Sequence, residues 1–110
     1  MTAGDVVWVP FPHVEDNRLR PRPALLVATG MGDPHDLCWA LMITSAANEA
    51  WPGDVLIPDH DAVGLPVASR IRTAKIATVT AASTRRLGRL PDPLWAEVRA
   101  RVLAQLALAP

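Results

Sequence analysis

Prolines and glycines cut the chain into short segments, and this punctuation limits its fold more than any other feature. The 110 residues include 11 prolines and six glycines, most of which precede Pro91. Proline lacks a backbone N–H and glycine favours turns, so long helices do not fit between them. The intervening segments are rich in β-branched and apolar residues, which favour strands. The sequence therefore predicts a small sheet with many turns.

Five segments have the composition of strands. They are Asp5–Pro10, Pro23–Thr29, Leu37–Ser45, Asp54–Pro58 and Ser69–Val79. In the last of them, Ile71 alternates with Arg70 and Arg72. Such alternation is typical of a strand with one exposed face, so that face is predicted to be basic.

The C-terminal segment has helical periodicity instead. Apolar residues recur at every fourth position, at Leu94, Val98, Val102 and Leu106. Asp92 is the expected N-cap of this helix, and Pro93 is its first helical residue. A shorter helix is expected over Thr80–Leu87, before Gly88.

A chain of this length supports one hydrophobic core, so residues 1–110 are predicted to form a single domain. Short strands followed by one terminal helix favour a mainly β fold with a C-terminal helix (α+β), built as a small, curved antiparallel sheet or barrel. The longest uncharged apolar stretch, Leu37–Ala47, is shorter than the roughly 20 residues that cross a bilayer. We therefore expect a cytoplasmic protein with no membrane partner.

The formal net charge is zero, but the charges are unevenly distributed. Residues 1–66 hold nine acidic and three basic residues, and residues 67–110 hold two acidic and eight basic ones. Ten of the 11 basic residues are arginine, whose planar donors match two phosphate oxygens at once. A neutral chain has no long-range attraction for nucleic acid, yet its clustered arginines predict a local phosphate-binding surface.

The sequence contains no convincing metal or cofactor motif. Cys38 is the single cysteine, so no disulfide can form within the chain, and its apolar neighbours predict a buried side chain. Asp59, His60 and Asp61 have the composition of a metal site, but neighbouring side chains of a turn point in different directions. We expect a solvated turn there, and neither a metal nor a cofactor.

Five stretches occur in a characteristic order and spacing. They are GDVVWVPFP (4–12), RPALLVA (22–28), ITSA (43–46), SRIRTAKIATV (69–79) and RRLGRLPDPLWAEVRARV (85–102). Together they resemble the MazF/PemK toxins of bacterial toxin–antitoxin systems over nearly the whole chain. The resemblance implies a small SH3-like barrel of the MazF/PemK/CcdB type that forms homodimers. It also implies cleavage of single-stranded RNA without a metal, and inhibition by a cognate antitoxin.

Cleavage of this kind needs the 2′-hydroxyl to attack the neighbouring phosphate, which leaves a 2′,3′-cyclic phosphate and a 5′-hydroxyl. The enzyme must move two protons and stabilise charge on a pentacovalent phosphate. The catalytic arginine and threonine of the family match Arg22 and Thr44. The resemblance implies that Arg22 binds the scissile phosphate and that Thr44, with Ser45, donates hydrogen bonds to it.

Several residues are candidates for the group that accepts the proton of the 2′-hydroxyl. Some members carry an aspartate two residues after the arginine that Arg72 matches, and Ala74 takes its place here. Candidates for acid–base or phosphate contact in the first loop are His13, Glu15 and Asp16, each of which also fits a solvated loop. Arg72 remains a further candidate for phosphate contact.

Other RNA contacts are expected from exposed arginines and from an aromatic ring that could stack on bases. These candidates are Arg18, Arg20, Arg70 and Trp51.

Each assignment has a structural alternative. Arg18 and Arg20 also fit a solvated loop, and Arg22 fits an ion pair with an acid such as Asp5. Two further tryptophans in apolar strands are expected in the core or in a dimer interface. They are Trp8 and Trp39.

Two other functions stay open. CcdB-like proteins share the fold and poison DNA gyrase without nuclease chemistry, although this chain ends in Leu-Ala-Pro and lacks the Trp-Gly-Ile ending that engages gyrase. Ala74 is also compatible with a catalytically degenerate module that binds RNA or antitoxin.

Overall fold

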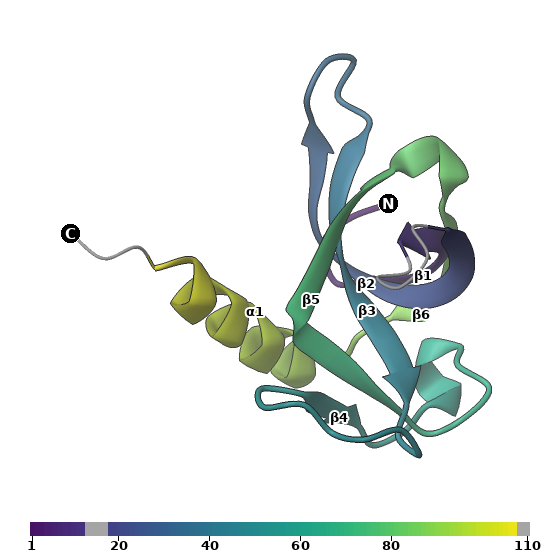
Figure 1. The fold of residues 1–110 in the computed structure, drawn as a ribbon, viewed down its shortest axis with the longest axis vertical. Helices are drawn as coiled ribbons and strands as arrows, with labels where there is room; N and C mark the ends of the chain where they lie inside the picture. The colour runs from purple at the N-terminus through teal and green to yellow at the C-terminus, as the bar shows by residue number, and fades with distance from the viewer. Residues whose placement is uncertain (13–17, 108–110) are drawn as a thin grey trace.

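Six antiparallel strands form one curled sheet with a helix beside it (Figure 1). The computed structural model describes residues 1–12 and 18–107. The strands are β1 (Asp5–Pro12), β2 (Leu19–Met31), β3 (Leu37–Ser45), β4 (Val55–Ile57), β5 (Ser69–Thr80) and β6 (Arg85–Arg89). The helices are the two short 3-10 helices η1 (Asp61–Val63) and η2 (Ala81–Ser83) and the α-helix α1 (Asp92–Leu106).

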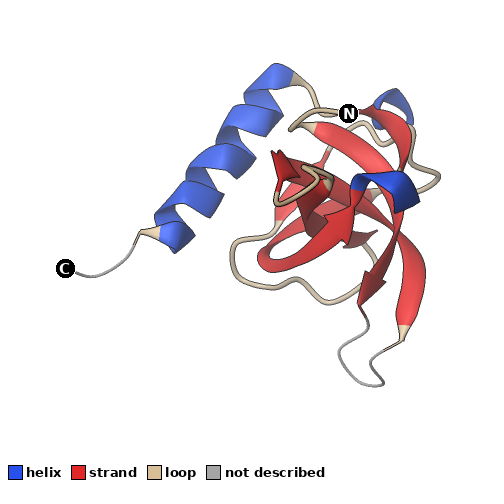
Figure 2. Ribbon diagram, turned by 90° about the horizontal axis from the view of Figure 1, so that it is seen from above, coloured by secondary structure: helices blue, strands red, loops and turns tan. Residues whose placement is uncertain are grey.

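The strand order is β4-β5-β3-β2-β1-β6, and each neighbouring pair is antiparallel. Figure 2 shows the sheet curling on itself while α1 lies along its outside. This architecture confirms the predicted mainly β fold with a C-terminal helix. In residues 1–12 and 18–107, no helix is both long enough and apolar enough to cross a lipid bilayer.

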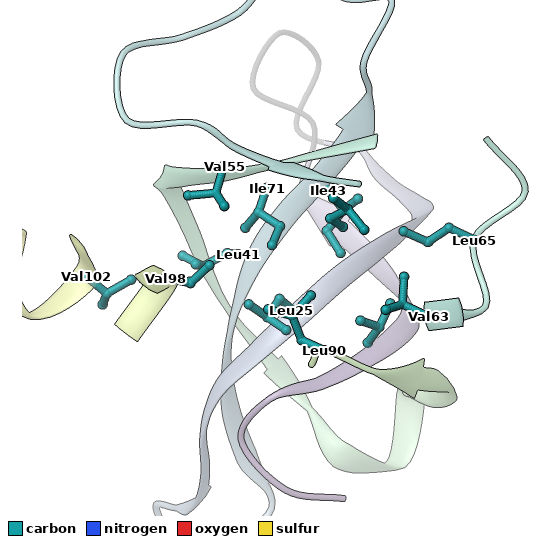
Figure 3. Packing of buried hydrophobic residues seen from close by; sticks show 12 residues of the cluster. Leu25, Leu41, Ile43, Val55, Val63, Leu65, Ile71, Leu90, Val98 and Val102 are labelled. Atoms are coloured by element: carbon teal, nitrogen blue, oxygen red, sulfur yellow. The ribbon is translucent and has the colours of Figure 1, made fainter. Parts of the chain in front are cut away.

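Curling buries side chains on both faces of the sheet. One cluster joins Leu25 and Leu41 of the sheet to Val98 and Val102 of α1 (Figure 3). The other cluster uses the opposite face of the strands. Its members include Val9, Phe11, Ala24, Cys38 and Met42. Cys38 is therefore buried, as predicted.

The prediction of a helix over Thr80–Leu87 is wrong. The chain makes the short turn η2 there, and Ser83 Oγ donates a hydrogen bond of 3.0 Å to the Thr80 carbonyl. Such local side-chain bonds compete with helix formation. The next residues form β6, which pairs with β1, so a long-range contact decides their conformation.

β2 begins earlier than predicted, so Arg20 and Arg22 lie inside the strand and not in front of it. Proline is tolerated in a strand where one edge is unpaired. The pairing of β2 with β3 ends at Ala24, which leaves that edge open at Pro21 and Pro23. Both prolines are therefore compatible with this part of β2.

α1 begins one residue earlier than predicted. Pro91 is the N-cap and has no side-chain capping hydrogen bond, and Asp92 is the first helical residue. Val98 and Val102 are buried, as the four-residue repeat predicts, but Leu106 at its end is half exposed.

The Asp5 carboxylate fastens the start of β1 to β6. The Thr2 N–H donates to Oδ2 at 2.9 Å, and Oδ1 lies 3.2 Å from Arg89 Nη1 and 3.4 Å from Arg86 Nε. Burial alone raises the pKa of Asp5. The hydrogen bond from Thr2 and the two guanidinium groups outweigh that effect, so the pKa falls below its ordinary value of 3.8. Asp5 thus pairs with Arg86 and Arg89, and not with Arg22.

We expect acid to weaken the folded state through Asp5. A carboxyl group whose pKa is lowered by folding contributes stability above its unfolded pKa, and this contribution is lost as the pH falls through the folded value. Asp5→Asn should lower the free energy of unfolding by about 1 kcal/mol at pH 7. The difference from wild type should then shrink below about pH 4. Urea unfolding at a series of pH values measures it, and a difference that does not change with pH would contradict this account.

Candidate functional site

Three polar residues lie on one face of neighbouring strands at one end of the sheet. Thr44 of β3 pairs with Arg70 of β5, and residues paired across strands share a face. The pairing of β2 with β3 ends at Ala24 and Met42. Arg22 and Thr44 are the next residues on the same face of these two strands. Thr44 and Arg70 are thus direct neighbours, and alternation puts Arg22 on the same face of the sheet, one step beyond the last pair of β2 and β3.

Arg22 is half-buried and pairs with Val9 of β1 through the backbone. In the part of the chain that the structure describes, no hydrogen bond or ion pair engages its guanidinium group. The acid that could have held it, Asp5, is bound by other arginines. A partly desolvated guanidinium group of this kind can donate two parallel hydrogen bonds to an oxyanion.

Thr44 is 6% exposed, and its hydroxyl oxygen accepts a hydrogen bond of 2.7 Å from Asn48 Nδ2. Sequence reasoning missed Asn48, because no motif marked this loop residue as a partner of β3. Ser45 Oγ accepts a hydrogen bond of 3.1 Å from the Ala47 N–H. Successive side chains of a strand point to opposite faces, so the register favours Thr44 over Ser45 as the partner of Arg22.

The loop between β3 and β4 is fastened to β5 at several points. Arg70 Nη2 donates to the Ala46 carbonyl at 2.7 Å, and Arg72 Nη2 donates to the Glu49 carbonyl at 2.9 Å. Thr73 Oγ1 donates to the Gly53 carbonyl at 2.8 Å. Arg70 lies beside Thr44 as expected of a site residue, but part of its guanidinium group is committed to this loop.

Arg72 does not lie on an exposed basic face, so the prediction of its exposure is wrong. Its side chain is 6% exposed and forms an ion pair of 2.9 Å with Asp54, whose side chain is 5% exposed. The loop between β3 and β4 covers it, since Arg72 also donates to the Glu49 carbonyl and lies against the Trp51 ring.

Tryptophan side chains lie at the surface. Trp51 is 42% exposed, and the Arg72 guanidinium carbon lies 4.2 Å from the centre of its ring. Trp8 and Trp39 are each 38% exposed, so the expectation that they belong to the core is wrong. Their expected role in a dimer interface stays a prediction.

The remaining candidates do not assemble a second site. His60 Nδ1 lies 2.9 Å from the Leu65 carbonyl and 3.3 Å from Asp61, as in an ordinary turn. Across the described residues, no group of three or more metal-binding side chains occurs. Arg18 and Arg20 are exposed at the start of β2. The first-loop candidates lie outside the described residues. They are His13, Glu15 and Asp16.

Comparison with known proteins identifies the family. A family model described as "PemK-like, MazF-like toxin of type II toxin-antitoxin system" matches residues 2–106. The crystal structure of MazF from Deinococcus radiodurans is 26% identical, with a TM-score of 0.76 over 98% of this chain and 97% of that chain. A MazE-MazF structure from the same organism is 24% identical, with a TM-score of 0.72 over 99% and 97%.

A mycobacterial endoribonuclease in complex with its cognate antitoxin shares the fold. It is 15% identical, with a TM-score of 0.69 over 99% of both chains. No curated protein matches the chain closely enough to count as a relative. Because the family match spans nearly the whole sequence, the chain belongs to the PemK-like, MazF-like toxins of type II toxin–antitoxin systems.

Proposed function

We propose that this toxin is an endoribonuclease that cleaves single-stranded RNA without a metal, by attack of the 2′-hydroxyl on the adjacent phosphate. The observation that carries the proposal is that Thr44 pairs with Arg70 and that alternation puts Arg22 on the same face, one step beyond the last pair of β2 and β3. This arrangement combines a cation without a partner in the described structure with a hydroxyl on the same face of the sheet. These groups suit a phosphate whose negative charge grows during reaction.

Each residue has a distinct task in this mechanism. Arg22 binds the non-bridging oxygens of the scissile phosphate and stabilises the pentacovalent state with two charge-assisted hydrogen bonds. The Thr44 hydroxyl donates a hydrogen bond to an oxygen of the same phosphate. Arg70 adds positive charge beside Thr44. The proton of the attacking 2′-hydroxyl is assigned to a group of the first loop, namely His13, Glu15 or Asp16, and the leaving 5′-oxygen takes up a proton from a water molecule to become the 5′-hydroxyl.

The wider binding surface continues outward from these residues. Arg18 and Arg20 precede Arg22 on or next to β2 and would guide the RNA backbone, while the exposed ring of Trp51 would stack on a base. As a toxin of its family, the protein would work in the cytoplasm as a homodimer and would be inhibited by a cognate antitoxin. Solved complexes of MazE with MazF support the antitoxin partner.

The test is to incubate the purified protein with a long single-stranded RNA in excess EDTA and to map the cut ends. We expect cuts at short recurring sequences, with 5′-hydroxyl ends. No cuts across varied RNAs, together with growth arrest that survives Arg22→Ala, would favour a gyrase poison. Binding of RNA without cleavage would instead point to a degenerate module, in which the absence of an aspartate at Ala74 has removed the chemistry.

A further inference from the structure

The hydrogen bond between Asn48 and Thr44 also constrains the direction of the Thr44 hydroxyl proton. Asn48 Nδ2 donates to Thr44 Oγ1 at 2.7 Å, so one lone pair of the hydroxyl oxygen is occupied. A hydroxyl group has a single proton, which rotates to suit its surroundings. With Asn48 as the donor, the Thr44 proton must point away from Asn48. It is therefore available to an acceptor on the face that Thr44 shares with Arg22 and Arg70.

The backbone of the turn that carries Asn48 is itself held in place. The Asn48 N–H donates to the Ser45 carbonyl at 3.1 Å, which closes a tight turn directly after β3. On one side of Asn48, Arg70 binds the Ala46 carbonyl, and on the other side Arg72 binds the Glu49 carbonyl. Two arginines of β5 thus anchor the turn on both sides of Asn48.

We propose that Asn48 is a positioning residue, which directs the Thr44 hydroxyl proton toward the scissile phosphate. The inference rests on the proposed function, because it assigns a role at the same site. It gives Arg70 and Arg72 an indirect role as well, since both hold the turn that carries Asn48. Asn48 is not required to touch the RNA.

A double-mutant cycle tests this role, because a residue that acts only through Thr44 has no effect once the hydroxyl is gone. The four proteins are wild type, Asn48→Ala, Thr44→Val and the double variant. Single-turnover cleavage in EDTA should be at least about 10-fold slower in Asn48→Ala than in wild type. Asn48→Ala should change the rate by less than about twofold in the Thr44→Val background.

The affinity of the same four proteins for RNA gives a second measurement of the cycle. The probe is an RNA oligonucleotide with a 2′-deoxy substitution at the cleaved nucleotide, which cannot form the cyclic product. Asn48→Ala should weaken its affinity about threefold, and only where Thr44 is present. Ala50→Ser, an exposed position in the same loop, should match wild type in rate, affinity and melting temperature.

The experiment distinguishes a failure of the role of Asn48 from a failure of the proposed function. Equal losses from Asn48→Ala in both backgrounds, no loss in either, or a loss that follows a lowered melting temperature would overturn the role of Asn48 while cleavage by the wild type stands. A wild type that binds the oligonucleotides but cleaves none overturns the proposed function, and the affinities then decide the role of Asn48. A wild type that neither binds nor cleaves RNA overturns both.

Discussion

Arg22→Ala is expected to lower the rate of RNA cleavage at least about 100-fold, which is the scale seen when one donor to a transition-state oxyanion is removed. The fold should tolerate the change, because no side-chain partner holds the guanidinium group in the described structure. Single-turnover cleavage measures the rate, and thermal unfolding measures the stability.

Arg22→Lys and Arg99→Ala are the matched controls. Lysine keeps the charge but loses the planar pair of donors, so Arg22→Lys should retain only part of the activity. Arg99 is exposed on α1, and its loss should leave the cleavage rate unchanged. Cleavage by Arg22→Ala at the wild-type rate would contradict the assigned role.

The second large effect is expected at the buried pair of Arg72 and Asp54. Removing one partner leaves a charge in the protein interior without compensation, so Arg72→Ala should lower the free energy of unfolding by about 3 to 5 kcal/mol. Asp54→Ala should have a comparable effect, since Asp54 Oδ2 also accepts the Trp51 N–H at 2.9 Å. Urea unfolding measures both variants.

The double variant Arg72→Ala with Asp54→Ala separates this reading from a direct catalytic role of Arg72. Its loss of stability should be clearly smaller than the sum of the two single losses, because no unpaired charge remains. Strictly additive losses in stability, or an Arg72→Ala protein that is fully stable and yet inactive, would contradict the structural role.

The strands were predictable where local pattern and tertiary pairing agree. Leu37–Ser45 has the bounds of β3, since its apolar residues fit a strand buried on both faces. β6 was missed because Arg85–Arg89 has few strand-forming side chains and forms only by pairing with β1. Propensity is a weak guide where a distant partner decides the conformation.

The site was predictable in part. The sequence pointed to Arg22 and Thr44 through a resemblance, and the register then placed them on one face of the sheet. Alternation predicted an exposed Arg72, because the sequence does not show that the loop between β3 and β4 folds over it. The hydrogen bond from Asn48 to Thr44 depends on the conformation of the loop after β3, and no sequence pattern predicts that contact.

The most direct test of the account compares two RNA oligonucleotides that differ in a single atom. One carries the mapped cleavage sequence, and the other has a 2′-deoxy substitution at the nucleotide that supplies the attacking hydroxyl. In excess EDTA, the account predicts that the wild-type protein cuts the first to a 2′,3′-cyclic phosphate and a 5′-hydroxyl and leaves the second intact. Cleavage of both oligonucleotides, or cleavage only when a divalent metal is added, would contradict it.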